Sequence, residues 1–485
     1  MIVQKICDIM YQLPQNINKN KIFIVNRSTI DNRLDAQYYS ANLNLSGFVK
    51  LSSVVIVKGG KRIPKGYGYS NEQTPYHYLR VADMDSDAQV EVNSLTNISK
   101  EVFDILERYE IFEGELAISI AGTIGKTTIL KNIPADKRVI LTENCAKILA
   151  KPNVGLLPEY LKLCLELPIV KKQLDLNYIQ TTIPKLGLDK IVGIKIPPIP
   201  CMQKQQEIVD YINEAYTQKR AKEVEAQQLL DSIDDYLLKE LGITIPKENA
   251  SSIKNRIFVI NLSTIERDRL DSNYFDKKYR ILLDSIKEGT YPLHSLGDNN
   301  ITSFISTGQT PKSDCYTEEE TDFPILKAGS YKGYEIDLGK ISYTTKKQSC
   351  SVRKGDIFIL SAAHQAEYIA KQICYLNETP KPNTSFVGEL LCIRASALVN
   401  SMYLYSLLST QVYKTLLNRE KRGQTSHLYA NDVSRILIPL PSIEKQNKIA
   451  KHIVDIRTRA KALRAEGKAI LDNAKHEVEQ MIMEK

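Results

Sequence analysis

The sequence lacks the cysteine, histidine and apolar patterns that mark disulfide frameworks, metal sites and membrane spans. Its eight cysteines form no C-x-x-C pair, and scattered thiols of this kind are typical of a reducing compartment. Its six histidines form no close pair and no H-E-x-x-H motif. No apolar run approaches the roughly 18 residues that cross a bilayer, and the N-terminus has no secretory pattern. We therefore expect a cytoplasmic protein that holds no metal.

The motifs of common catalytic sites are also missing. GTIGKTT at 122–128 resembles a phosphate-binding loop, but Ile120 stands where G-x-x-x-x-G-K-[ST] requires glycine. There is no G-x-S-x-G and no Asn-Pro-Pro-aromatic or Asp-Pro-Pro-Tyr methyltransferase signature. Glu335 and Asp337 near Lys340 could imitate a nuclease centre, although a charged turn explains them better. We expect no catalysis by this chain.

The bulk composition is that of an ordinary globular protein. Of the 485 residues, 43% are apolar and 25% are charged, and the length predicts roughly two to four domains. The formal net charge of +8 permits a polyanionic partner but does not require one. A local basic patch is therefore more informative about a polyanionic partner than the net charge of the whole chain.

The most informative feature is a repeat with a period of about 240 residues. KIFIVNRSTIDNRLDAQYY at 21–39 matches RIFVINLSTIERDRLDSNYF at 256–275, and IPPIPCMQKQQEIV at 196–209 matches LIPLPSIEKQNKIA at 437–450. Repeat periods of about 20–50 residues indicate solenoids, whereas this longer period indicates the duplication of a whole domain. A duplicated unit can form a pseudo-twofold molecule, which suits a target with two halves.

Each copy is predicted to contain an opening strand, a mixed body and a long helix. The opening strands are Lys21–Val25 and Arg256–Ile260, which are short β-branched and aromatic runs. Within the bodies, the matched segments are 76–84 with 323–331, 114–126 with 355–367 and, each as one helix, 159–181 with 402–425.

A long helix follows the Pro-rich end of each body. Four- and three-residue steps place apolar residues on one seam, with polar faults. The seam positions are Ile208, Ile212, Ala215, Ala226, Leu229, Ile233 and Tyr236 in the first copy, and Ile449, Ile453, Ile456, Ala460, Leu463, Ile470, Ala474 and Met481 in the second, whose frame also includes Gly467 and Glu477. A lone helix with one seam is unstable in water, so we expect the two helices to pair as a coiled coil. The pairing is antiparallel if a pseudo-twofold axis relates the two halves.

The predicted fold class is α+β, with two tandem domains that are each followed by a long helix. The predicted boundaries are an N-terminal extension at 1–20, a first body at 21–198, a first helix at 199–242, a linker at 243–255, a second body at 256–440 and a second helix at 441–485.

This order of segments resembles the specificity subunit of Type I restriction–modification systems. The residues that carry the resemblance are Lys204-Gln205 with Ile208, Lys445-Gln446 with Ile449, and the segment GELAISIAGTIGK at 114–126, which is similar to a segment of that family's target-recognition domains. The resemblance covers nearly the whole chain, and the order and duplication of the motifs carry it more than any one of them.

The resemblance implies a function and a set of partners. Each body would be a target-recognition domain that recognises a few base pairs of double-stranded DNA, and the paired helices would set the distance between the half-sites. Two modification subunits carrying S-adenosylmethionine would methylate adenine N6. Motor-nuclease subunits that use ATP and Mg²⁺ are further candidate partners. This chain would hold no cofactor and contact no membrane.

The candidate DNA contacts lie on loops, because base readout needs hydrogen-bonding side chains that reach a groove and phosphate contacts need cations beside them. The loop at 58–69 is the best candidate, and 308–312 is its less basic counterpart. For each residue, an ordinary surface or buried polar role remains the alternative. The candidates are Lys58, Lys61, Arg62, Lys65, Tyr67, Tyr69, Arg80, Thr123 and Lys126 in the first copy, and Gln309, Lys312, Lys327, His364, Gln365, Lys421 and Arg422 in the second.

The two copies differ at one turn, where SAAHQAEYIAK at 361–371 replaces SIAGTIGKTTI at 119–129. The second loop must therefore close differently, as expected of two domains with different half-sites. Three alternatives stay open: a related methylation-linked phage-defence system, a scaffold without a nucleic-acid role, and a fused nuclease or methyltransferase.

Overall fold

The computed structural model describes residues 43–84, 90–177, 184–246, 271–363, 365–423 and 427–484, together with residues 27, 30, 39, 41, 259–261, 265 and 269. The predicted extension 1–20, the opening strand Lys21–Val25 and His364 lie outside these residues. The chain divides into two compact units, Met1–Arg220 with Gly467–Lys485, and Ala221–Glu466. None of the helices in the described ranges combines the length and the apolar character that a membrane crossing requires.

Two four-stranded sheets form the body of the first unit. One is antiparallel, in the order β2-β9-β6-β7, and consists of β2 (Val55–Gly59), β6 (Leu116–Ser119), β7 (Thr127–Ile129) and β9 (Cys145–Ala150). The other has the order β4-β3-β8-β5 and consists of β3 (Tyr76–Leu79), β4 (Thr96–Asn97), β5 (Glu110–Ile111) and β8 (Arg138–Leu141). Strands β3 and β8 are parallel, so their carboxyl ends meet at one edge of this sheet.

Short elements close the first body. β1 (Val49–Lys50) pairs with β10 (Lys195–Ile196), which brings the two ends of the body together. α2 (Leu51–Val54) and α6 (Leu188–Gly193) lie beside this pair. α3 (Lys100–Leu106) begins at Ser99, whose hydroxyl accepts a hydrogen bond from the Val102 N–H and so caps the helix.

The second unit repeats this plan. The order β12-β21-β18-β19 reproduces the first sheet, with β16 and β15 added at its edge. In the other sheet, β17-β14-β20 reproduces β4-β3-β8, with β14 and β20 parallel, while β13 is added next to β17 and no strand of that sheet corresponds to β5. The strands are β11 (Leu293–Ser295), β12 (Thr302–Thr307), β13 (Tyr316–Thr317), β14 (Pro324–Leu326), β15 (Tyr331–Lys332), β16 (Glu335–Ile336), β17 (Ser342–Thr344), β18 (Ile357–Leu360), β19 (Ile373–Tyr375), β20 (Ser385–Phe386), β21 (Leu390–Ala395) and β22 (Leu437–Pro439). Since β11 pairs with β22 as β1 pairs with β10, the predicted duplication and α+β class are confirmed.

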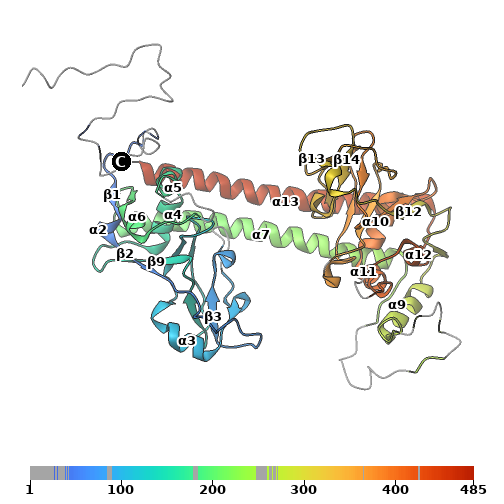
Figure 1. Cartoon of the computed structure of the whole chain (residues 1–485), viewed down its shortest axis with the longest axis horizontal. Coiled ribbons are helices and arrows are strands. Elements are labelled where there is room, and N and C mark those ends of the chain that lie inside the picture. Colours follow the sequence, from blue (N-terminus) through green and yellow to red (C-terminus); the bar gives the residue numbers. More distant parts are fainter. Residues whose placement is uncertain are drawn as a thin grey trace, which may run out of the picture. The chain divides into compact units, whose positions relative to one another are not determined.

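The second unit departs from the sequence prediction near its start. The predicted strand Arg256–Ile260 is described only at Val259 and Ile260, and neither lies in a strand. Val259 is 90% exposed, so it lacks the pairing and burial that would make a β-branched run a strand. Among the described residues of this unit's body, the first helix is α9 (Lys277–Lys287), which packs against α11 (Figure 1).

The single helix predicted at 159–181, and its counterpart at 402–425, each form two helices. The first copy contains α4 (Pro158–Glu166) and α5 (Pro168–Asp175), and the second contains α10 (Ser401–Ser409) and α11 (Gln411–Arg419). Pro168 offers no N–H and holds Leu167 out of the helical region, at ψ 138°. In the second copy, Thr410 interrupts the helix and caps α11 by accepting a hydrogen bond from the Tyr413 N–H at 3.3 Å.

Two long helices follow the bodies, α7 (Met202–Glu240) after the first and α13 (Ile443–Met483) after the second, which ends with α12 (Ala430–Val433) and β22 (Figure 1). In the first unit, Ile208 and Ile212 of α7 share a core with Leu471 and Val478 of α13. In the second unit, Ile233 and Leu237 share a core with Ile449 and Ile453. Because the start of α7 packs with the end of α13, and the reverse, the helices pair in the antiparallel direction that the sequence predicted.

Beyond Leu463, the predicted seam of α13 is correct at Gly467 and Ala474, which are buried, and wrong at three other positions. Leu471, Val478 and Ile482 are buried where Ile470, Glu477 and Met481 were expected. The steps from Leu463 to Gly467 and from Gly467 to Leu471 are both four residues long. The predicted frame alternates steps of four and three residues, which keeps the apolar stripe close to the roughly 3.6 residues of one helical turn. Two successive steps of four therefore move the next buried position by one residue.

Candidate nucleic-acid interface

In the first unit, the predicted DNA-binding loop starts where β2 leaves its sheet. The Gly60 N–H donates to the Cys145 carbonyl at 2.9 Å, and the Lys61 N–H donates to the Leu141 carbonyl at 3.0 Å. A Cβ at position 60 would lie 2.1 Å from the Thr142 carbonyl oxygen. Only glycine permits this close approach, which holds the loop at the carboxyl ends of β3 and β8.

The loop covers a hollow of 480 Å³ that collects several of the predicted residues. Tyr67 and Tyr69 are exposed by 42% and 55%, although tyrosine is commonly half-buried. Exposed aromatic faces next to cations are the chemistry that nucleic-acid surfaces use for stacking and phosphate contact. The residues that line the hollow include Arg62, Tyr67, Tyr69, Tyr78, Arg80 and Glu143.

Carboxylates hold both arginines of this hollow. The Arg62 Nε lies 2.6 Å from the Glu143 Oε1, and Arg80 makes two hydrogen bonds to Asp83, at 3.0 and 2.9 Å. Burial raises the pKa of Glu143, but hydrogen bonds from Arg62 and Thr142 outweigh it and hold that pKa below its ordinary value. Glu143 is therefore anionic at neutral pH, and a DNA phosphate must compete with it for Arg62.

The two tyrosines are fixed by different contacts. The Tyr67 hydroxyl donates to the Glu101 Oε1 at 2.8 Å, and the Tyr69 ring lies 6.1 Å from the ring of Tyr78. Burial raises the pKa of Tyr78 to about 12, and its hydroxyl donates to the Lys61 carbonyl at 2.7 Å. The loop is thereby tied to the sheet at both its backbone and its side chains.

The remaining candidates of the first unit are not among the residues that line this hollow. Lys65 is exposed on the loop, and Lys58 is exposed on β2. The Lys126 Nζ lies 3.4 Å from the Met84 carbonyl, at the 3-10 turn Val81–Asp83 that Arg80 opens. Thr123 is exposed in the turn between β6 and β7, and no described contact joins it to the hollow.

In the second unit, the loop at 308–312 has the same backbone geometry with different side chains. The Gly308 N–H donates to Leu390 at 3.1 Å, and the Gln309 N–H donates to Phe386 at 3.0 Å. A Cβ at Gly308 would lie 2.1 Å from the Phe386 carbonyl oxygen, as at Gly60. The predicted equivalence of the two loops is therefore confirmed.

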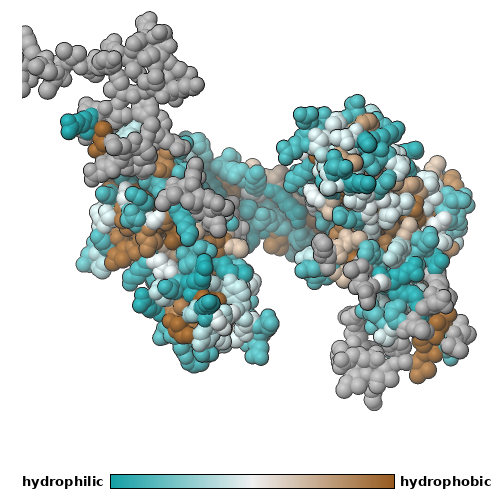
Figure 2. Space-filling view, in the orientation of Figure 1, coloured by the Kyte–Doolittle hydropathy of each residue, from teal (hydrophilic) through white to brown (hydrophobic). Residues whose placement is uncertain are grey.

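The side chains on this second loop are less basic than those on the loop at 58–69. The Gln309 Oε1 accepts a hydrogen bond from the Ser349 hydroxyl at 3.0 Å, and Lys312 is exposed. Lys327 follows β14 as Arg80 follows β3, and its ammonium lies 3.9 Å from the Tyr316 ring centroid. Figure 2 shows that the surface over β13 and β14 is largely hydrophilic, which fits a face that makes polar contacts.

The turn that differs between the copies closes differently, as predicted. In the first unit, Gly122 and Gly125 adopt positive φ angles of 74° and 82° in a tight turn between β6 and β7. In the second unit, β18 and β19 are joined by a longer loop, in which Ala370 has a φ of 59°. Gln365 is exposed on this loop.

Lys421 and Arg422 support that longer loop. The Lys421 Nζ donates to the Ala366 carbonyl at 2.7 Å, and burial lowers the pKa of Lys421. The Arg422 Nε lies 2.8 Å from the Asp432 Oδ2. Both cations already have protein partners, so contact with a phosphate requires an exchange of partners, as at Arg62. Their DNA contact stays a prediction.

The sequence analysis missed the residues that hold these cations in place. Glu143 and Asp83 fix the two arginines, Tyr78 supports the loop, and Tyr316 lies under Lys327. Glu143 lies 81 residues from Arg62 in the chain, so no local motif could have joined them. Asp83, three residues after Arg80, was within reach of a local pattern.

One family of known proteins matches the chain. The family model described as the Type I restriction modification DNA specificity domain matches residues 45–230 and again 300–467. No curated protein matches the chain.

Three solved structures are similar to the chain. The S subunit of a Type I restriction-modification system from M. genitalium is 14% identical, with 92% of this chain and 97% of that chain covered and a TM-score of 0.41. The HsdS subunit from Thermoanaerobacter tengcongensis is 14% identical, with 90% and 96% covered and a TM-score of 0.34. A chain from a structural study of complex assembly and conformational transition in the type I R-M system is 15% identical, with 90% and 96% covered and a TM-score of 0.47.

The assignment rests on the family model, whose two matches together span more than half of the 485 residues. The first match covers the body of the first unit and the second covers most of the body of the second, and these two bodies repeat one strand order and one loop geometry. The chain belongs to the Type I restriction-modification DNA specificity family, and it carries two DNA-recognition domains of that family.

Proposed function

We propose that the two domains bind the two halves of a bipartite DNA target and direct its modification by partner subunits. One observation carries this proposal. The same loop leaves the same sheet edge in both units, with identical backbone contacts at Gly60 and Gly308, while the side chain that follows is Lys61 in one and Gln309 in the other. A duplicated scaffold with different loop side chains suits recognition of two different half-sites.

The chemistry of each loop supports a different emphasis. In the first unit, Lys61, Arg62 and Lys65 supply positive charge for phosphates, and Tyr67 and Tyr69 supply exposed rings. In the second unit, Gln309 carries an amide, which pairs with adenine in the major groove when it reaches a base edge. We assign the first loop mainly to contacts with the DNA phosphate backbone and the second mainly to contacts with DNA bases.

The chain itself does no chemistry in this proposal. Two modification subunits would carry S-adenosylmethionine and methylate adenine N6, and motor-nuclease subunits would supply ATP- and Mg²⁺-dependent restriction. The paired helices α7 and α13 would set the spacing between the half-sites and offer faces for these subunits.

Single-molecule sequencing of adenine methylation in the source genome tests the proposal, with this gene intact and deleted. Deletion should remove one bipartite methylated motif and leave all other motifs unchanged. The modification subunit must still be expressed in the deleted strain, and restoring this gene should restore the motif. An unchanged methylome under those conditions would refute the proposal.

A further inference from the structure

The second unit contains a hollow that the DNA-binding proposal does not use. It has a volume of 330 Å³, within the range of about 300–1,000 Å³ that small-molecule sites occupy. Its walls come from the end of α7, from α10, α11 and α13, and from the chain around Gly333 and Gln372. It therefore lies where the second body meets the long helices of its own unit.

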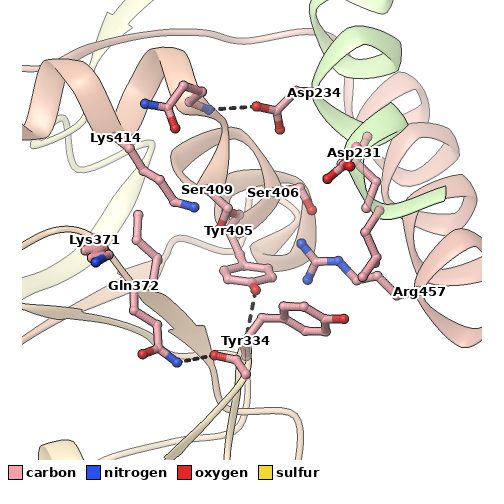
Figure 3. A pocket seen from close by; sticks show the side chains of 15 residues that line it. Asp231, Asp234, Tyr334, Lys371, Gln372, Tyr405, Ser406, Ser409, Lys414 and Arg457 are labelled. Atoms are coloured by element: carbon pink, nitrogen blue, oxygen red, sulfur yellow. Dashed lines mark hydrogen bonds between the residues drawn. The ribbon is translucent and has the colours of Figure 1, made fainter. Parts of the chain in front are cut away.

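Three cations line this hollow, and they come from separate elements. Figure 3 shows the Lys414 ammonium, from α11, and the Arg457 guanidinium, from α13, directed into the same space from two sides. Lys371 lies on the wall next to Gln372. Within the described residues, none of these three cations forms an ion pair. Two carboxylates, Asp231 and Asp234, also line the hollow, so the cations exceed the anions there by one. An excess of positive charge facing one space favours an anion within it.

Arg457 is held rigidly in this position. Its guanidinium carbon lies 4.5 Å from the Tyr405 ring centroid and 5.1 Å from that of Tyr334. The Tyr405 hydroxyl in turn donates to the Tyr334 carbonyl at 3.2 Å. Rings on its faces leave the in-plane N–H groups of an arginine as its donors, and the Arg457 Nε is buried without a hydrogen-bond partner among the described residues.

A buried hydroxyl adds a further donor. Ser406 is 1% exposed, lines the hollow, and has an Oγ without a hydrogen-bond partner in the described part of the chain. Most buried hydroxyls in folded proteins have a partner. The Ser406 hydroxyl is therefore a donor beside the hollow for which the described residues supply no acceptor.

The two carboxylates that line the hollow neutralise only part of this positive charge. The Asp234 Oδ2 accepts a hydrogen bond from the Gln411 N–H at 2.7 Å, so it is engaged at the start of α11. Burial lowers the pKa of Lys414; Asp234 opposes that effect and Arg457 adds to it. Arg457 is thus close enough for its charge to act on Lys414, while Asp231 and Asp234 leave one positive charge in excess among the five groups.

We propose that this hollow binds a phosphate-type oxyanion, with Arg457, Lys414 and the Ser406 hydroxyl as its donors. Donors from three helices suit the several oxygens of a tetrahedral phosphate better than the two oxygens of a carboxylate. The bound anion would join α10 and α11 of the body to α13. The proposal does not depend on the DNA-binding role, because the site lies apart from both recognition loops in sequence and requires no DNA.

Isothermal titration of the full chain with inorganic phosphate, at constant ionic strength, tests this inference. We expect saturable binding at one site per chain and an unfolding temperature that rises with phosphate concentration. Lys414→Met keeps the alkyl stem and removes the charge, and should weaken binding at least about tenfold. Ser406→Ala removes only the hydroxyl and should also weaken it, without loss of stability in the absence of phosphate.

The matched control is Lys354→Met, which removes an exposed lysine of the same unit and should leave phosphate affinity unchanged. A parallel titration with AMP distinguishes the source of the anion, since tighter binding of AMP assigns a nucleotide and equal or weaker binding assigns the free anion. The inference fails if the folded wild-type chain shows no saturable phosphate binding. It also fails if Lys414→Met and Ser406→Ala bind like wild type, or if Lys354→Met loses as much affinity as Lys414→Met.

Discussion

Arg62 illustrates how a protein partner fixes a cation of the loop at 58–69. Its guanidinium is already paired with Glu143 at 2.6 Å, so its position is set before a target arrives. Exposed ion pairs of this kind contribute little to stability, roughly 0–1 kcal/mol. A phosphate can therefore take the place of Glu143 without unfolding the loop.

Neutralising Lys61, Arg62 and Lys65 together should weaken binding to all DNA sequences by a similar factor. Each lost phosphate contact should reduce the slope of log affinity against log salt by about 0.9. The measurement is duplex binding at several salt concentrations, in complex with the partner subunits. A matched triple variant at exposed positions 332, 340 and 354 should leave the slope unchanged, and an unaltered slope in the loop variant would exclude this loop as a phosphate anchor.

His77 gives the first body a pH dependence. It lies in β3 and is 2% exposed; burial and then the nearby Lys137 lower its pKa. The folded state thus binds fewer protons than the unfolded state, so this contribution to stability is full above the unfolded pKa of about 6.5 and is lost as pH falls below it. Calorimetry from pH 8 to pH 5.5 should show a smaller decrease in unfolding temperature for His77→Phe than for wild type. Parallel curves would contradict this assignment.

At the scale of elements, the repeated Lys-Gln step has a structural explanation. The Gln205 side chain accepts from the Leu157 N–H at 2.9 Å and donates to the Gly155 carbonyl at 2.7 Å and the Pro200 carbonyl at 2.9 Å. Gln446 repeats this with the Asn400 N–H and the Pro441 carbonyl, each at 2.9 Å. Each buried glutamine therefore joins the start of a long helix to its body.

Gln205→Ala should lower the free energy of unfolding by roughly 1–3 kcal/mol, because it leaves buried backbone groups without partners. The neighbouring exposed Lys204 is the natural control, and Lys204→Ala should change stability by less than about 0.5 kcal/mol. Urea unfolding followed by circular dichroism measures both. Equal effects of the two variants would show that the buried amide has no special role.

The shifted seam of α13 can be tested in the same way. Leu471 is 2% exposed and belongs to the core of the first unit, whereas Ile470 only packs at its edge. Leu471→Ala should cost about 2–5 kcal/mol, and Ile470→Ala clearly less. Thermal unfolding of the two variants compares these losses of stability directly. A larger loss for Ile470→Ala than for Leu471→Ala would support the seam that the sequence predicted, without the shift.

At the scale of the whole molecule, duplication makes the two recognition bodies independent. Each body has its own sheets and its own apolar clusters, such as the one around Val139 in the first and the one around Phe358 in the second. The two bodies are attached to the long helices α7 and α13 in the same way, because Gln205 and Gln446 each accept a hydrogen bond from a backbone N–H of their own body. This arrangement permits one body to change its target while the other keeps its own.

Replacing the second body, residues 293–440, with that of another family member should change one half of the methylated motif and leave the other half and the spacing unchanged. The physical reason is that the exchanged body carries with it the apolar cluster around Phe358, which lies within the body, while α7 and α13 remain. Methylation sequencing of a strain that carries the chimaera measures the outcome. A change in both halves would show that the bodies do not act separately.

The sequence alone determined the features that depend on local pattern. The repeat located two bodies and two long helices, and the apolar steps together with the duplication predicted their antiparallel pairing. These succeed because periodicity, proline and glycine act over a few residues. Pro168 also lay within reach of such reasoning, and the break that it causes between α4 and α5 could have been predicted.

Only the tertiary structure decided which distant side chains meet. Glu143 reaches Arg62 across 81 residues, and the seam of α13 is set by what α7 and the first body place opposite it. The oxyanion hollow brings Ser406, Lys414 and Arg457 together from three helices. No local pattern encodes such contacts, because they follow from how the sheets and helices pack, and that packing depends on the whole chain.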